Sequence, residues 1–134
     1  MDDLATAAVE AALAAGATYA DARALTSRSE SMGARNGVLE SLDRTSRAGI
    51  GVRALIGSSW GFFSVPDLSP AAARRAGTRA AEVARASAMV AGRPLTLSPQ
   101  PAVRATWRNE VRGSLGRVAR GEGRSPGRRH ARDA

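Results

Sequence analysis

Few residues in this chain have the type and spacing that enzyme chemistry requires. Three carboxylates come closest, and they lie on both sides of an Asn36-Gly37 pair that favours a hairpin turn: Glu30, Glu40 and Asp43. Because cross-strand neighbours lie roughly 5 Å apart, two of them could act as a general acid and a general base. Pairing with nearby arginines is the simpler role, and those arginines are Arg28, Arg35 and Arg44. The carboxylates alone therefore define no catalytic site.

The other reactive residue types lack the partners that their chemistry needs. His130 is the only histidine and the chain has no cysteine, so we predict a solvated side chain, because structural zinc almost always has four protein ligands. The Gly49-Ile50-Gly51 segment lacks the later glycine of a phosphate-binding loop, which favours strand glycines packed closely against a neighbour. Ser58 and Ser59 have no base to activate them and are predicted to lie in a turn. We predict no catalytic, cofactor-binding or metal-binding residue.

The first element that the sequence predicts is a helix. Its N-cap is expected at Asp2 or Asp3 and its end at Gly16. Its apolar stripe comprises Leu4, Ala8 and Ala12 with their neighbours Ala5, Val9 and Leu13. The acidic start is unlike a signal peptide, and Glu10 interrupts the apolar run long before the roughly 20 residues of a membrane span. We predict a soluble helix and, because cysteine is absent, a cytoplasmic setting.

The next part of the chain predicts an antiparallel β-meander of about four to five strands. The first three strand segments are Tyr19 to Arg28, whose small face could lie against a helix, and the two hairpin arms Ser29 to Arg35 and Val38 to Arg44. A bulge is expected near Val38-Leu39, where the alternation is imperfect. A further strand carries Ile50, Val52, Ala54 and Ile56 on one face, and the chain returns through Trp60 to Val65 after a Gly57-Ser58-Ser59 turn.

Most of the aromatic area lies in Trp60, Phe62 and Phe63, since only 4% of the residues are aromatic. Adjacent strand positions point to opposite faces, so at least one of the three must lie off the principal core face. Two interpretations remain open. The trio could form a second buried layer, or an interface with a missing domain or a partner subunit.

A second helix is predicted to pack on the same sheet. Ser69-Pro70 is a strong start, with serine as the N-cap and proline at the first helical position. The buried stripe is expected at Ala73, Ala76, Ala80, Val83 and Ala84; the residues expected in water are Arg75, Arg79, Glu82 and Arg85. Gly92 and Pro94 are expected to end the helix. After an extended stretch that contains several prolines, residues 106–134 are rich in Arg and Gly and are predicted to be disordered.

The pattern as a whole predicts an α+β fold, with an N-terminal helix, the antiparallel meander and a second helix on the same sheet. Residues 1–105 would form one domain, and residues 106–134 an Arg-rich tail. Much of the 43% apolar content is alanine, which buries little area per residue. We therefore expect one modest core and a domain that is marginally stable on its own.

The net charge of +8 does not by itself identify a nucleic-acid partner. Most of the excess lies within residues 105–134, where Arg120 to Arg132 has the sequence RGEGRSPGRRHAR. Such a segment would bind RNA or DNA weakly through phosphates, with a strong salt dependence and no sequence specificity. Incidental polycation behaviour is the simpler interpretation. We predict no specific nucleic-acid partner and no membrane partner.

Four segments occur in an informative order: Ala15–Arg23 (AGATYADAR), Ser29–Ser41 (SESMGARNGVLES), Ala48–Leu55 (AGIGVRAL) and Ser59–Pro70 (SWGFFSVPDLSP). In this order they resemble the N-terminal domain of the TldD/PmbA metallopeptidase family, once described as modulators of DNA gyrase, in a TldD-like form. The resemblance covers roughly Leu4 to Arg108. No single segment is diagnostic, and the argument depends on all four together.

The resemblance has implications for chemistry and partners. In that family a larger C-terminal domain carries an HExxxH helix and a distant cysteine that bind zinc, and the glutamate is the general base on metal-bound water. No residue of this chain matches those positions, so the chain is predicted to be inactive alone and to hold no cofactor. The resemblance also implies a domain that helps to shape the chamber for an extended, unfolded peptide and helps TldD-type and PmbA-type subunits to pair.

The final segment departs from the family. Family members continue with an apolar, acidic segment, whereas this chain changes near Arg108 to Arg, Gly and Ser. That change is typical of an out-of-frame reading in a GC-rich gene, so we expect a truncated or frameshifted product. The predicted function is the non-catalytic N-terminal domain or fragment of a TldD/PmbA-type zinc metallopeptidase. The alternative is a stand-alone interaction module that binds a peptidase subunit through its sheet, or nucleic acid through its tail.

Overall fold

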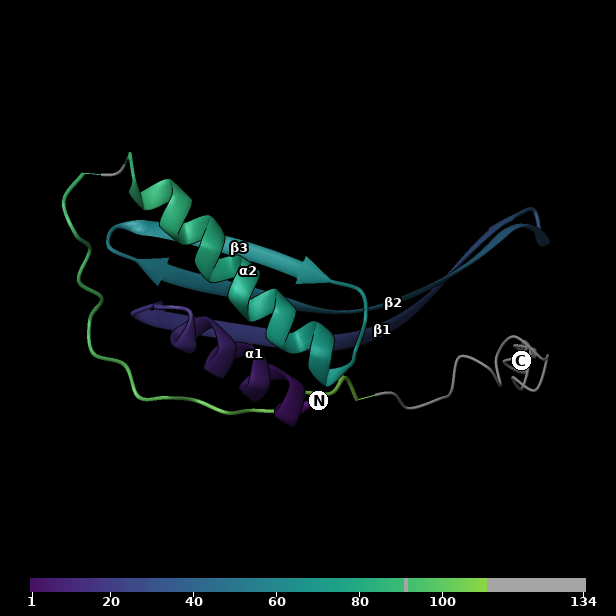
Figure 1. Cartoon of the computed structure of the whole chain (residues 1–134). Coiled ribbons are helices and arrows are strands. Elements are labelled where there is room, and N and C mark those ends of the chain that lie inside the picture. Colours follow the sequence, from purple (N-terminus) through teal and green to yellow (C-terminus); the bar gives the residue numbers. More distant parts are fainter. Residues whose placement is uncertain (91, 111–134) are drawn as a thin grey trace, which may run out of the picture.

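The computed structural model describes residues 1–90 and 92–110. Its elements follow the order α1 (Asp2–Ala14), β1 (Tyr19–Arg35), β2 (Val38–Ile56), β3 (Ser59–Val65) and α2 (Pro70–Ala88). The strands form one antiparallel sheet in the order β1-β2-β3, and both helices cover the same face of it (Figure 1). The predicted α+β class is confirmed, as is the packing of the second helix on the sheet. Within the described residues, no helix is both long and apolar enough to cross a membrane.

The predicted number of strands, four to five, is too high. The predicted strands Tyr19 to Arg28 and Ser29 to Arg35 are one 17-residue strand, β1. The predicted strand Val38 to Arg44 and the strand that follows it are likewise one 19-residue strand, β2. Pairing continues through Arg28↔Ser46 and Ser29↔Thr45 without a break. No glycine or proline interrupts the chain there, so the ladder simply continues.

The turn between β1 and β2 has the expected geometry. Asn36 and Gly37 have φ angles of 52° and 79°, and two positive φ values define the type I′ turn that suits a tight hairpin. The register shifts between Gly33, which is opposite Ser41, and Ala34, which is opposite Leu39. Glu40 is therefore the extra residue of a bulge, and the bulge predicted near Val38-Leu39 is confirmed one residue further along.

The turn between β2 and β3 is shorter than predicted. Gly57 has a φ of 62°, and Ile56 pairs with Ser59, so the turn is the two-residue Gly57-Ser58. A positive φ at the first position alone is typical of a type II′ turn. Ser59 is the first residue of β3 and is only 8% exposed, which corrects its assignment to the turn.

Both ends of α1 are defined by backbone geometry. Met1, not Asp2 or Asp3, is the N-cap. The two aspartates lie in the first turn, where their negative charges interact favourably with the helix dipole. Gly16 has a φ of 100°, and the amides of Gly16 and Ala17 donate to the carbonyls of Leu13 and Ala12. This is the Schellman ending, so the predicted stop at Gly16 is confirmed.

The start of α2 was predicted correctly and its end was not. The Ser69 hydroxyl accepts a hydrogen bond from the Ala72 amide at 3.2 Å, and Pro70 follows as the first helical residue. The helix ends at Ala88 rather than near Gly92 and Pro94. Met89 and Val90 are 84% and 92% exposed, so a further turn would pack against little, and helices in proteins take most of their stability from packing.

The core between the sheet and the helices consists mainly of alanine. Its fully buried positions include Ala8 and Ala12 of α1, and α2 buries seven small residues: Ala72, Ala73, Ala76, Gly77, Ala80, Ala81 and Ala84. Leu13 and Val83, both predicted in the apolar stripes, are 45% and 41% exposed. The two helices meet on small residues, so larger side chains are displaced to the flanks. The predicted small face of β1 does lie against this core, at Ala20, Ala22 and Ala24.

Two glycines allow α2 to approach its neighbours at backbone distance. A Cβ at Gly77 would overlap the carbonyl oxygen of Ala8 in α1, and a Cβ at Gly61 in β3 would overlap the carbonyl oxygen of Ala80. Near the end of α2, Arg85 donates a hydrogen bond to the carbonyl of Ala15, just beyond α1. The helix is thus in direct contact with both α1 and the sheet.

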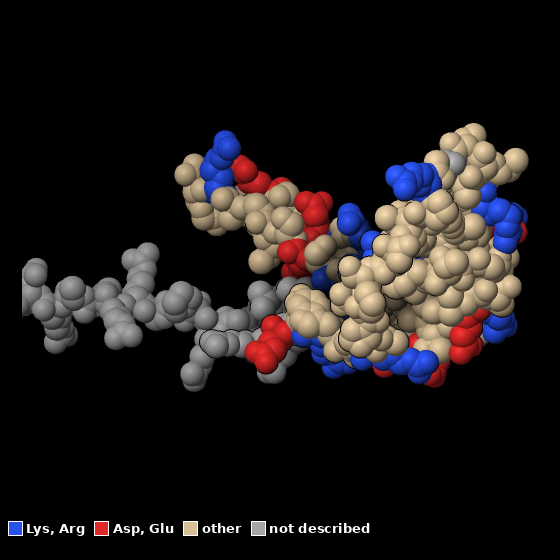
Figure 2. Space-filling model, turned by 90° about the vertical axis from the view of Figure 1, so that its left-hand side faces the viewer, with Lys and Arg blue, Asp and Glu red and all other residues tan. Residues whose placement is uncertain are grey.

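The hairpin extends well past the helices, and we call its residues 27–47 the hairpin arm. Figure 1 shows the arm as a two-stranded ribbon that projects from the body, and Figure 2 shows it as a separate projection with charged side chains along it. Near its tip, four apolar residues are between 43% and 65% exposed: Met32, Val38, Leu39 and Leu42. The arm is therefore held by its own ladder and not by the core.

The described part of the C-terminal segment has no helix or strand after α2. It runs back past α1 (Figure 1), and the Thr106 hydroxyl donates to the Asp2 carboxylate at 2.8 Å. The boundary near residue 105 stays a prediction. The segment from Arg120 to Arg132, with His130, lies outside the described residues.

We expect Gly77→Ala to lower the free energy of unfolding by about 2 kcal/mol, the upper end of the overpacking cost less the gain in helix propensity. The added methyl group forces the backbones of α1 and α2 apart, and overpacking of this kind costs ~1–3 kcal/mol. Alanine favours a helix more than glycine does, by about 1 kcal/mol. A loss of stability must therefore come from the steric overlap. Urea unfolding followed by circular dichroism measures it.

Gly92→Ala is the matched control for that variant, because no atom lies within 4 Å of its added methyl group. It should change the free energy of unfolding by less than about 0.5 kcal/mol. Equal stability of the Gly77 variant and the wild-type protein would show that the helices do not meet at this glycine.

Candidate interaction surface

The carboxylates considered for acid and base chemistry form ion pairs instead. Glu30 lies directly opposite Arg44, with an Oε2 to Nε distance of 2.7 Å. Glu40, the bulge residue, lies 3.7 Å from Arg35. The prediction of surface pairing with these arginines is confirmed for both glutamates. Asp43 lies opposite Ser31 in the ladder.

The glycines and serines considered for binding or catalysis have structural positions. A Cβ at Gly49 would lie 2.8 Å from the Val65 carbonyl oxygen, and one at Gly51 would lie 3.4 Å from the Phe62 ring. Both glycines lie within β2 and pack against a neighbour, as predicted. Ser58 is in the β2–β3 turn, and Ser59 is buried at the start of β3.

The described residues do not fit a zinc ion. No three His, Cys, Asp or Glu side chains gather within residues 1–90 and 92–110, and this part of the chain contains neither histidine nor cysteine. Zinc sites in proteins are built largely from these two residue types. No catalytic step through a metal can therefore be derived from the described residues.

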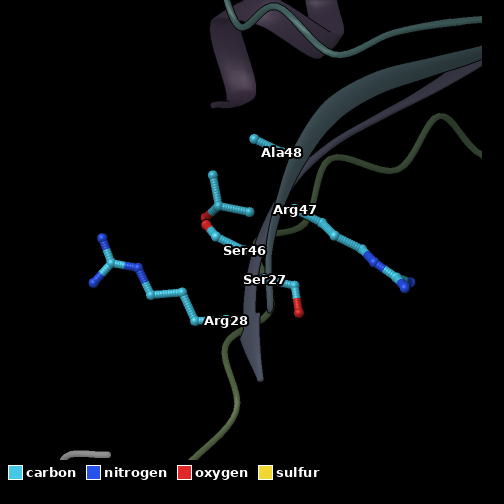
Figure 3. A pocket seen from close by; sticks show the side chains of 6 residues that line it. Ser27, Arg28, Ser46, Arg47 and Ala48 are labelled. Atoms are coloured by element: carbon cyan, nitrogen blue, oxygen red, sulfur yellow. The ribbon is translucent and has the colours of Figure 1, made fainter. Parts of the chain in front are cut away.

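A shallow depression of about 340 Å³ lies where the hairpin arm leaves the body, and it is lined by Thr26, Ser27, Arg28, Ser46, Arg47 and Ala48. Figure 3 shows that Arg28 and Arg47 extend to opposite sides of the ribbon. Their strand positions require this, because adjacent register positions alternate between faces. The two guanidinium groups do not converge on one ligand, and the depression has no recognisable chemistry.

The larger surface feature is the sheet face that the helices leave uncovered, which we call the outer face. It carries three residue rows across the strands: Tyr19, Leu55 and Trp60; Asp21, Arg53 and Phe62; Arg23, Gly51 and Ser64. Trp60 and Phe62 are 41% and 60% exposed, whereas Phe63, on the opposite face, packs against the core. The prediction that at least one of the aromatic trio lies off the core face is confirmed.

The first row forms a small aromatic cluster. Leu55 is only 2% exposed, and its cross-strand neighbours on the two sides are Tyr19 and Trp60. The Tyr19 and Trp60 rings meet edge to face, with centroids 5.7 Å apart and an interplanar angle of 81°. Such a pair is favourable beyond its buried area, so this row forms a mainly apolar platform.

The second row places one ion pair beside the platform. Nε and Nη2 of Arg53 donate to the Asp21 carboxylate at 3.0 and 2.7 Å, and the Arg53 guanidinium lies 5.5 Å from the Trp60 ring centroid. The hydrogen bond and charge of Asp21 raise the pKa of Arg53. Burial, and then the charge of Asp21, raise the pKa of Tyr19 above its usual value. The outer face thus carries exposed aromatic side chains beside an ion pair in which the charges of Arg53 and Asp21 neutralise each other.

Sequence reasoning found the aromatic trio and missed Tyr19, Asp21 and Arg53. The missing information was the register. The Asn36-Gly37 turn without the bulge would place Tyr19 opposite Ala54 rather than Leu55, and a slip by one residue moves every side chain to the other face. The imperfect alternation near Val38-Leu39 was the available signal.

The family described as PmbA/TldA metallopeptidase domain 1 matches residues 20–88. The match extends from the second residue of β1 to the end of α2 and includes the hairpin arm, Gly61, Gly77 and all of the outer face except Tyr19. This chain therefore belongs to that family, as the resemblance indicated. No curated protein matches the chain.

Tyr19 is the only tyrosine, so tyrosinate absorbance reports its ionisation alone. We expect the native midpoint to lie above the midpoint in denaturant. Because the folded pKa is raised, this contribution to stability is fully present below the unfolded value of about 10 and is lost as the pH rises through the folded pKa. Asp21→Asn should lower the native midpoint, since it removes the negative charge and leaves Arg53⁺ nearby. An unchanged midpoint would place Asp21 away from the ring.

Proposed function

We propose that this chain is the non-catalytic N-terminal domain of a TldD-like zinc metallopeptidase, and that it packs through its outer face on a catalytic domain or partner subunit of the same family. The family match supports the ancestry. The observation that carries the role is the uncovered outer face, where Trp60 and Phe62 are 41% and 60% exposed on a three-stranded sheet.

Physical reasons favour docking over catalysis. Aromatic residues are enriched in the centres of protein interfaces, and a platform with few rotamers loses little entropy when it is covered. Arg53 adds a directional donor whose charge is already balanced by Asp21. Such an arrangement presents area and shape to a partner, whereas the described residues offer no nucleophile with a base and no metal ligand set.

The domain then contributes to catalysis only indirectly. In the complete family member it would form part of the wall of the chamber in which an unfolded peptide meets the zinc, and it would help TldD-type and PmbA-type subunits to pair. Zinc belongs to the catalytic domain of the family and not to this chain. We place the assembly in the cytoplasm, consistent with a chain that has no cysteine.

The test combines the protein with a full-length PmbA-type subunit. The chain alone should bind no stoichiometric zinc and cleave no unfolded peptide, and it should associate with the subunit in isothermal titration. Trp60→Ala should weaken that association about tenfold or more, because a central aromatic anchor contributes ~1.4 kcal/mol or more.

Met89→Ala serves as the control for that variant, since Met89 is 84% exposed at the end of α2, away from the outer face. It should leave the affinity unchanged. Stoichiometric zinc with cleavage by the chain alone would overturn the proposal, as would an association that Trp60→Ala leaves intact.

A further inference from the structure

Strand β3 forms one edge of the sheet, because the strand order is β1-β2-β3. Within residues 1–90 and 92–110, no backbone hydrogen bond reaches the side of β3 that faces away from β2. In Figure 1, α2 crosses in front of β3, and no described segment runs along that edge of the strand. An edge of this kind presents a row of backbone donors and acceptors to any approaching strand.

The turn geometry identifies which groups point outward. In a two-residue hairpin the closing pair, here Ile56 and Ser59, is a hydrogen-bonded pair, and such pairs alternate along an antiparallel ladder. Residues 59, 61, 63 and 65 therefore bond to β2. The N–H and C=O groups of Trp60, Phe62 and Ser64 point outward.

The edge carries none of the devices that usually block strand addition. Natural edge strands are protected by lysine, proline, inward charges or bulges. β3 has the sequence SWGFFSV, without a charged residue or a proline, and its seven residues pair with β2 in one unbroken register. On the outer face beside it, Arg53 of β2 is paired with Asp21, and the further charge, Arg23, lies on β1, two strands away from Ser64.

We propose that this edge is a self-association site, at which β3 of two copies of the chain pair antiparallel about a two-fold axis through Phe62. Phe62 then lies opposite Phe62 of the partner subunit, Trp60 lies opposite the partner's Ser64, and Ser64 lies opposite the partner's Trp60. These three symmetric pairs are all hydrogen-bonded pairs and would exchange about six main-chain bonds. Two three-stranded sheets become one continuous sheet with a closed, isologous interface.

The side chains favour a second copy over an unrelated peptide. Phe62 is 60% exposed and would meet its own copy, and aromatic cross-strand pairs are favourable. A neutral edge offers no charge by which an acidic or basic peptide would be selected. It also adds no local like-charge repulsion at the contact between two chains that each have a net charge of +8.

Helix α2 supplies a second contact. Gly61 places Ala80 and Ala84 directly over β3, so the α2 helices of two copies run antiparallel above the joined strands. Gly77 faces α1, and Ala81 lies on the same side of α2. Val83 lies on the opposite flank of the helix and is 41% exposed. This valine, which the core does not bury, becomes covered by the partner's α2.

Sedimentation equilibrium over a range of concentrations measures the association. We expect a monomer–dimer equilibrium in the micromolar range, as befits a small interface. Phe62→Lys should raise the dissociation constant at least tenfold, because two like charges would meet on the axis. Leu25→Lys is the matched control: Leu25 is on the outer face, 50% exposed, but on β1 at the opposite edge. It should leave the dissociation constant unchanged.

Disulfide trapping tests the register independently. Because the chain has no cysteine, Phe62→Cys introduces a single thiol. Hydrogen-bonded cross-strand positions have Cα atoms about 5.5 Å apart, which a disulfide can span. With oxidised glutathione as the oxidant, which is reduced to two glutathione thiols, the Phe62→Cys dimer should form at least tenfold faster than the Leu25→Cys dimer.

Three results would overturn the inference: a chain that is monomeric at all concentrations, a dimer that Phe62→Lys leaves intact, or equal trapping rates for the two cysteine variants. Circular dichroism of each variant establishes that it is folded. The inference does not rest on the proposed peptidase role, because these experiments contain no second protein. Self-association can therefore fail while binding to a PmbA-type subunit is retained.

Discussion

The close approach of α2 to α1 and to β3 is the constraint on which the rest of the structure depends. At Gly77 and Gly61 the helix meets its neighbours at backbone distance, and a single methyl group at either position would overlap a carbonyl oxygen. A core built this way consists mainly of alanine and contains few large side chains, so stability depends more on dense contact than on a large buried area. The layer is correspondingly thin, with two helices on one face and nothing described on the other.

Strand alternation explains where the large apolar residues of β3 are found. Phe63 and Gly61 face the core, so Trp60 and Phe62 lie on the outer face, while Val83 lies on a helix flank. These exposed residues are the part of the molecule best suited to contact another protein chain. The proposed role in assembly depends on these same exposed side chains.

Local features could be predicted from the sequence, and those that depend on pairing could not. The Asn36-Gly37 turn, the Gly16 stop and the Ser69-Pro70 helix start each follow from the backbone preferences of one or two residues. The strand number depended on whether pairing continues past residue 28, which only the opposite strand decides. The Asp21–Arg53 pair required the register beyond the bulge, and alanine-rich helices give too little contrast to show that Val83 is not buried.

Hydrogen exchange measured residue by residue tests most directly whether the glycine contacts of α2 hold the fold together. Amides of α2 and of β2 residues 50–55 should exchange only through global unfolding, because they lie in the layer that these contacts close. Amides of the hairpin arm should exchange at least ~100-fold faster by local opening, since no helix covers them. An arm as protected as the body, or an α2 that exchanges before the sheet, would contradict the central role of these contacts.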